Sequence, residues 1–160
     1  MNGELETYGR YLTERIQAIG SSLDGLPYQE LNRAPDLPDA NSPFVIATHI
    51  LGSTRAWVLG IVCGQDLRRD RAAEFVAQGS YDELTAAAKR LSADIERALV
   101  SLDPATLDDR VTPPQELWGE SEAHEITRRD GLAHMLEHAG MHLGHIHITR
   151  QLLEQRTGAV

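Results

Sequence analysis

The sequence predicts an all-α protein: a four-helix bundle with two longer inter-helix connections, in a single domain spanning residues 1–160. Strand signals are nearly absent, because the chain has no alternating apolar–polar runs. Four segments instead repeat apolar residues at intervals of three and four, the period of a helix that buries one face. Residues that begin or end helices flank these segments, so four helices joined by loops are expected.

The first predicted helix runs from about Gly3 to Leu23. Its apolar stripe passes through Leu5, Tyr8, Leu12, Ile16 and Ile19. The helix is expected to end near Gly25, and the proline-punctuated connector PYQELNRAPDLPDA follows it.

The second predicted helix has the clearest start. Ser42 can cap it, and Pro43 fits the first helical position, where a missing N–H costs nothing. It runs through FVIATHILGSTRAWVLGIVCG, with Gly64 as the predicted stop. This segment is apolar around most of its circumference, so we expect it to be the most buried helix.

The third predicted helix opens with a capping box, Ser80-x-x-Glu83, and runs to about Leu102. A long irregular stretch follows it, DPATLDDRVTPPQELWGESEAHEI. Such long loops are often functional.

The fourth predicted helix starts near Thr127, where Asp130 completes a weaker capping box, and runs to about Gln155, before Gly158.

Charge and composition exclude several classes of function. The net charge of −9 argues against a nucleic-acid partner, which needs a clustered basic surface. The one short basic cluster, DLRRDRAAE (residues 66–74), is interrupted by acids, and we interpret it as a solvated loop. Neither a membrane span of roughly 18 apolar residues nor a signal peptide is expected, so the cytoplasm is the predicted location. The single cysteine, Cys63, excludes an internal disulfide and is interpreted as a packed, inert thiol.

The segment HMLEHAGMHLGHIH, residues 134–147, is rich in histidine. His134, His138, His142 and His145 are spaced by four, four and three residues, which places them on one side of a helix. His142 lies within the apolar arc of this helix and His138 at its margin. His134 and His145 lie at the edge of the arc, and His147 lies on the far side.

Two imidazoles one turn apart in an apolar stripe need partners, because burying a polar group without one is costly. A divalent metal is an effective partner for His138-x3-His142, although hydrogen-bonded core histidines show the same spacing. His49, in the most apolar helix, can supply a third ligand. The residues on its side of that helix are small, which permits either close packing or an open pocket.

Three histidines with the remaining positions open are typical of a catalytic rather than a structural metal site. Imidazole ligands suit zinc, nickel, cobalt, copper or iron, and the ligand set does not choose among them. The cofactor expected overall is a divalent metal ion, zinc or nickel. Glu137, Glu125 or a backbone carbonyl can accept hydrogen bonds from the free ring nitrogens.

The segments NSPFVIATHILGSTRAWVLGIVCG and LEHAGMHLGHI together resemble the DinB-like, or YfiT-like, metal-binding four-helix-bundle superfamily over essentially the whole chain. The nearest resemblance is to the branch that includes mycothiol and bacillithiol S-transferases. In that family one histidine of the second helix and two of the last hold the metal, which implies His49, His138 and His142 here. The family's last motif commonly continues with Arg-Gly-Gln, whereas this chain has Leu143-Gly144-His145.

The resemblance implies a divalent metal that activates a low-molecular-weight thiol, similar to mycothiol or bacillithiol, for attack on a small electrophile. A metal-binding, stress-related bundle without catalysis and a metal-dependent hydrolase are the alternatives. A homodimer is expected by the same analogy. Trp118, Arg128 and Arg129, in and after the long loop, are guesses for substrate contacts, and a solvated loop with a surface Trp is the favoured interpretation for each.

Overall fold

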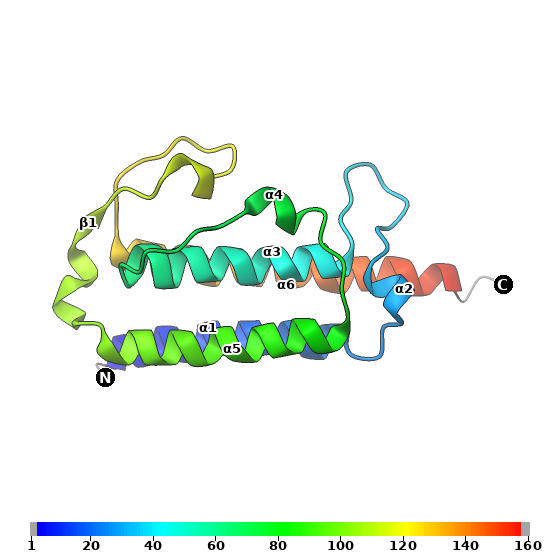
Figure 1. Ribbon diagram of the computed structural model, residues 1–160, viewed down its shortest axis with the longest axis horizontal. Helices are drawn as coiled ribbons and strands as arrows, with labels where there is room; N and C mark the ends of the chain where they lie inside the picture. Colours follow the sequence, from blue (N-terminus) through cyan, green and yellow to red (C-terminus); the bar gives the residue numbers. More distant parts are fainter. Residues whose placement is uncertain (1–2, 158–160) are drawn as a thin grey trace.

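The computed structural model describes residues 3–157, and the side chains of residues 3–155. Four long helical segments form a bundle (Figure 1): α1 (Gly3–Leu23), α3 (Pro43–Thr54) with its continuation η1 (Arg55–Val62), α5 (Tyr81–Ser101) and α6 (Arg128–Thr157). α1 packs against α5 and α6, and α3 with η1 packs against the same two helices. The predicted all-α four-helix bundle is therefore confirmed. The last helix was predicted to end at about Gln155; α6 continues to Thr157, and Gly158 lies outside the described residues.

One hydrophobic core fills the space between the four helices. Its contributions from α1 and α5 follow the helical period: Leu5, Leu12, Ile16, Ile19 and Leu23, and Leu84, Leu91, Ile95 and Leu99. The capping box at the start of α5 is present, because Ser80 Oγ accepts from the Glu83 amide at 3.2 Å and Glu83 Oε2 accepts from the Ser80 amide at 2.7 Å. These two features fix where α5 begins and which face it buries.

The second predicted helix consists of two successive segments, the α-helix α3 and its continuation η1. It starts as expected, with Ser42 Oγ accepting from the Val45 amide at 3.2 Å, and Gly64 follows its end with a φ of +72°. The turns widen to π-helix over Arg55–Val62, which the apolar pattern did not predict. The expectation that no segment is long and apolar enough to cross a membrane is wrong for Pro43–Val62, by length and hydropathy alone. Within the 18-residue window of this segment that passes the test, 67% is buried inside the bundle, as expected for a core helix.

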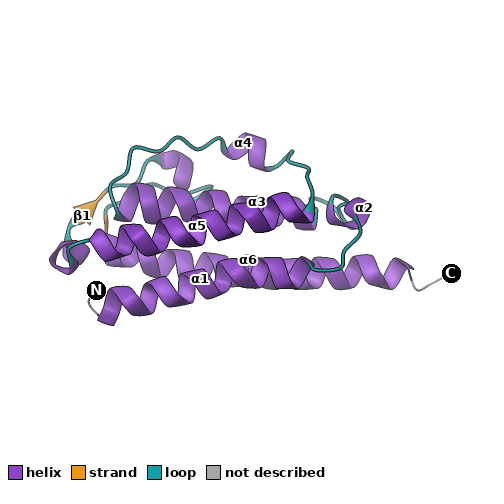
Figure 2. Cartoon of the chain, turned by 60° about the horizontal axis from the view of Figure 1, so that its bottom comes forward, coloured by secondary structure: helices purple, strands orange, loops and turns teal. Residues whose placement is uncertain are grey.

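The connections contain short elements of their own: α2 (Tyr28–Leu31), α4 (Arg71–Glu74), η2 (Pro104–Asp108), β1 (Arg110–Val111), η3 (Gln115–Leu117) and β2 (Ile126–Thr127). The two strands pair antiparallel, two residues each, and tie the ends of the long connection together before α6. Pairs this short carry no alternating pattern, which is why the sequence predicted no strand. The connection that carries α4 runs along the outer side of α3 in both views (Figure 1, Figure 2).

Candidate metal centre

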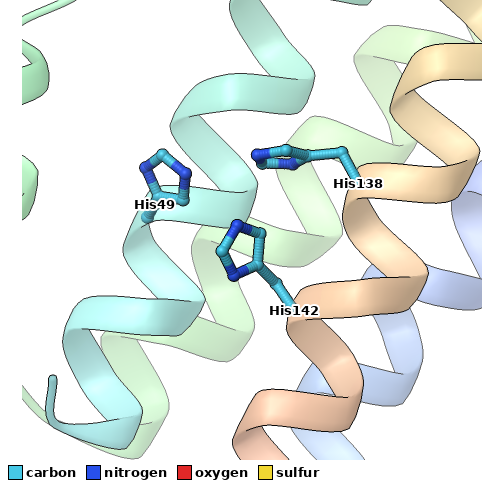
Figure 3. Close-up of side chains that lie close together, drawn as sticks. All are labelled: His49, His138 and His142. Carbon is cyan, nitrogen blue, oxygen red and sulfur yellow. The ribbon is translucent and has the colours of Figure 1, made fainter. Parts of the chain in front are cut away.

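Three histidines from two helices meet near the middle of the bundle. His49 extends from α3, and His138 and His142 extend from successive turns of α6 toward it (Figure 3). One ring nitrogen from each lies within 4.8 Å of the others, and the ring centroids are 4.5 to 5.2 Å apart. The structure therefore brings together the three residues that the sequence predicted, in an arrangement that could hold one metal ion.

A cavity of about 550 Å³ opens beside these histidines. The small residues near His49 were compatible with close packing or an open pocket, and a pocket is present, lined in part by His49 and Ser53. Its apolar walls include Phe75, after α4, and Trp118, after η3. The cavity is therefore lined both by helices of the bundle and by segments of all three connections between the long helices.

His49 contacts a buried ion pair formed by Glu74 and Arg69. Its Nδ1 lies 3.1 Å from Glu74 Oε2, and Arg69 donates to the same carboxylate from Nε and Nη2, each at 2.7 Å. The exposed fractions of the three side chains are only 11%, 8% and 10% for His49, Glu74 and Arg69. Burial alone raises the pKa of Glu74, but the hydrogen bonds from His49 and Arg69 outweigh it and lower the pKa below its usual value. The carboxylate is therefore ionised and accepts hydrogen bonds from both neighbours.

The carboxylate of Glu74 occupies space that only a glycine leaves on α3. A Cβ placed on Gly52 lies 2.1 Å from Glu74 Oε1 and 2.7 Å from its Cδ. Gly52 is thus one of the small residues beside His49 whose role the structure explains.

The pKa values of the two α6 histidines are strongly lowered. Burial is the main cause for both, and repulsion from the neighbouring imidazoles adds to it, so that the pKa of His138 falls to about 3 and that of His142 to about 4. Both rings are therefore neutral at pH 7, the state in which imidazole binds metal. His138 Nδ1 is buried and has no hydrogen-bond partner among the described residues. Neutral imidazoles with an unsatisfied ring nitrogen fit a divalent cation that accepts their lone pairs.

The sequence matches the DinB superfamily over residues 11–146, which is most of the chain. The chain belongs to the DinB superfamily. Among solved structures, a conserved protein from Enterococcus faecalis is similar, with a TM-score of 0.65 and 16% sequence identity over 94% of this chain and 96% of that one. At that identity the likeness shows the fold alone. No curated protein matches the chain.

The DinB superfamily is associated with metal binding, and the His49–His138–His142 cluster is the group in the described part of this chain that could serve that purpose. His145 stands beside it, with its Nδ1 3.2 Å from His142 Nδ1. His147 points elsewhere and contacts Ser22 Oγ at 3.2 Å, as its place on the far side of the helix predicted.

An aromatic cluster lies at one end of the cavity of this DinB-superfamily bundle. The His134 ring packs on Trp57 with centroids 4.5 Å apart, and Trp118 meets Trp57 edge-on at 5.1 Å. His124, for which the sequence predicted no role, packs on Trp118 with ring centroids 4.2 Å apart. The long connection is thus folded onto the bundle around Trp118, and Trp118 lines the cavity as a substrate contact would.

The two arginines proposed as substrate contacts are engaged elsewhere. Arg128 donates to the carbonyl of Val62 at the end of η1, and Arg129 binds Glu4 and Asp108. Neither lines the cavity, so the structure does not support the guess that they contact a substrate. Both arginines join the long connection and α6 to the rest of the bundle.

The hydrogen-bond partners expected for the histidines are also different. Glu137 is exposed and Glu125 lies 3.5 Å from Arg110, whereas the acid at the site is Glu74. The interpretation of residues 66–74 as a solvated loop is wrong for Arg69 and Glu74, which are buried against His49.

The interpretation of Cys63 fits the structure. The thiol lies at the end of η1, and burial raises its pKa to about 11, so it is protonated at neutral pH.

Proposed function

We propose that this protein binds one divalent metal ion, zinc or nickel, through His49, His138 and His142, and uses it to activate a small thiol. The thiol would be of the mycothiol or bacillithiol class, and its target a small electrophile, as in the S-transferase branch that the sequence resembles. The observation that carries the proposal is the convergence of three imidazoles beside a cavity of about 550 Å³. Three protein ligands leave room for an exchangeable ligand, which is the arrangement of catalytic rather than structural sites.

A divalent cation at this position supplies one chemical effect: it lowers the pKa of a thiol that binds to it, so that the nucleophilic thiolate forms at neutral pH. The protein supplies the rest. His138 and His142 are already neutral at pH 7, so no proton has to leave them before they bind a cation. Trp118 and Phe75 offer apolar walls that would hold an electrophile and exclude water from it.

Two measurements test the proposal. Elemental analysis of untagged, reconstituted protein should find close to one metal ion per chain, and less than about a tenth of an equivalent would defeat the site. Metal-loaded protein should accelerate the reaction of mycothiol or bacillithiol with 1-chloro-2,4-dinitrobenzene. In that reaction a C–S bond forms, the C–Cl bond breaks, and chloride and the thiol proton are released.

The matched control is His49→Ala, which removes one proposed ligand. A full metal complement with no thiol-dependent rate above this variant, over a panel of thiols and electrophiles, favours a metal-binding bundle without catalysis. Thiol-independent cleavage of p-nitrophenyl acetate would favour the hydrolase alternative. The homodimer and the cytoplasmic location remain predictions from the sequence.

A further inference from the structure

We propose that Glu74, with Arg69 behind it, is a positioning residue that fixes His49 in the Nδ1–H tautomer and so keeps the Nε2 lone pair free for a metal. This inference rests on the proposed metal site and adds a determinant that lies outside its three ligands. Glu74 comes from the short helix α4, in a connection rather than in the bundle.

The hydrogen-bond geometry around the carboxylate determines which atoms donate. Glu74 Oε1 accepts from Arg69 Nε, and Oε2 lies 2.7 Å from Arg69 Nη2 and 3.1 Å from His49 Nδ1. An ionised carboxylate can only accept, so His49 Nδ1 must carry the proton to bond with it. Arg69 Nη2 is also 3.3 Å from Nδ1, but its nearer acceptor is Oε2, and an arginine nitrogen always donates.

The tautomer of a histidine is set by the partner of whichever ring nitrogen does not bind the metal. Since Nδ1 of His49 faces Glu74, Nε2 is the nitrogen left for the cluster. Figure 3 shows the His49 ring with one nitrogen toward His138 and His142 and the other directed away from them. Glu74 therefore selects the tautomer in which the inward nitrogen is a lone pair.

The fold builds a specific place for this carboxylate. Asp70 Oδ1 accepts from the Ala73 amide at 3.0 Å and starts α4, whose last residue is Glu74. Gly52 leaves the space on α3 that the carboxylate fills. Phe75, the next residue, packs against the His49 ring with centroids 5.2 Å apart. The imidazole is thereby constrained both in orientation and in protonation.

Glu74→Gln is the discriminating substitution, because it keeps the size of the side chain. Arg69 presents two donors to the two carboxylate oxygens, and glutamine offers only one oxygen. An amide nitrogen in the place of Oε1 faces Arg69 Nε, and one in the place of Oε2 faces both Arg69 Nη2 and His49 Nδ1. In the second placement the amide can donate to Nδ1 only if Nδ1 gives up its proton, which moves the proton to Nε2 and blocks the lone pair.

The experiment combines a metal-free and a metal-dependent measurement. Two-bond ¹H–¹⁵N correlation spectra of metal-free, ¹⁵N-histidine-labelled protein report the tautomer of His49, and competition with a chromophoric chelator reports the zinc affinity. We expect Nδ1–H in the wild type, a shift toward Nε2–H in Glu74→Gln, and zinc affinity lowered about 10- to 100-fold. Glu137→Gln is the control, because it removes one negative charge near the α6 histidines without a hydrogen bond to them, and it should keep both wild-type values.

Several results would overturn the inference. If the spectra show His49 in the Nε2–H form in the wild-type protein, the inference is refuted without any variant. Unchanged tautomer and affinity in Glu74→Gln refute it as well, and an equal loss in Glu137→Gln would reduce the effect to general charge. If Glu74→Gln does not fold, Gly52→Ala displaces the carboxylate without changing any charge and should shift the same two readouts.

The proposed function can fail separately. Wild-type protein that has the Nδ1–H tautomer but binds neither zinc nor nickel refutes the metal site, and with it the role of Glu74 there. Wild-type protein that binds zinc, with a Glu74→Gln variant that binds equally well, refutes only the role of Glu74.

Discussion

Replacing Gly52 by alanine should destabilise the metal-free protein, although alanine is the better helix former. In an unobstructed helix interior, Gly→Ala gains about 1 kcal/mol. Here the new Cβ would lie 2.1 Å from Glu74 Oε1, so the carboxylate must leave its place. Arg69 and His49 hold that carboxylate in the interior, and breaking a buried ion pair costs about 3–5 kcal/mol. The net change in the free energy of unfolding is therefore a loss of about 2–4 kcal/mol.

Urea denaturation of the metal-free wild type and variant, followed by circular dichroism, measures this difference. Gly140→Ala is the matched control, because Gly140 lies within α6 and a Cβ there meets nothing within 4 Å. The control should be as stable as the wild type or more stable by up to about 1 kcal/mol. If Gly52→Ala is stabilised as much as the control, the Glu74 carboxylate can move away from α3 without a loss of stability. The inference that the carboxylate requires the space beside Gly52 would then be wrong.

Four further outcomes are expected. His138→Ala and His142→Ala should lose the metal in elemental analysis whereas His147→Ala keeps it, and equal loss in all three would place the site wrongly. The metal-free protein should lose stability as the pH falls from about 6.5 toward 4. The folded state lowers the pKa values of His138 and His142 to about 3 and about 4, so in this pH range these histidines bind protons in the unfolded chain but not in the folded one. Urea midpoints that stay constant over this range would contradict those shifts. Trp118→Ala should keep its metal but raise KM for 1-chloro-2,4-dinitrobenzene about threefold to tenfold, from the loss of an aromatic contact; an unchanged KM would remove Trp118 from the substrate site. Ser80→Ala should lose about 1 kcal/mol in thermal unfolding with metal content unchanged, because it removes only a helix cap.

The long helices and the three central histidines could be predicted because their signals are repeated along the chain. The apolar residues of α1 recur at each turn on the same face, so the buried face is indicated several times along the helix. Capping residues such as Ser42 and Ser80 mark where helices begin. His138 and His142 then follow from their places on that periodic framework. His49 followed from its position in the most apolar segment.

Glu74 and Arg69 could not be found in the same way. They belong to a connection whose only regular element is four residues long, too short to show a helical period. Asp70 as a helix-capping residue was the one usable signal, and it says nothing of which helix the turn packs against. The guess for Arg128 and Arg129 failed for a related reason, since proximity in sequence to the long loop does not reveal that Arg128 binds η1 and that Arg129 binds α1 and η2.

The short length of α4 has a consequence for dynamics. A four-residue helix has no stability of its own, so its order depends on contacts such as the Glu74–Arg69–His49 group and the packing of Phe75. Local opening of this connection, at a free energy below that of global unfolding, would release His49 from its acceptor while the bundle stays folded. If a cation binds the ordered state more tightly, then by linkage its binding also closes the connection and builds the wall of the cavity. Amide hydrogen exchange across residues 66–76 should then slow on metal binding more than exchange in α1 or α5.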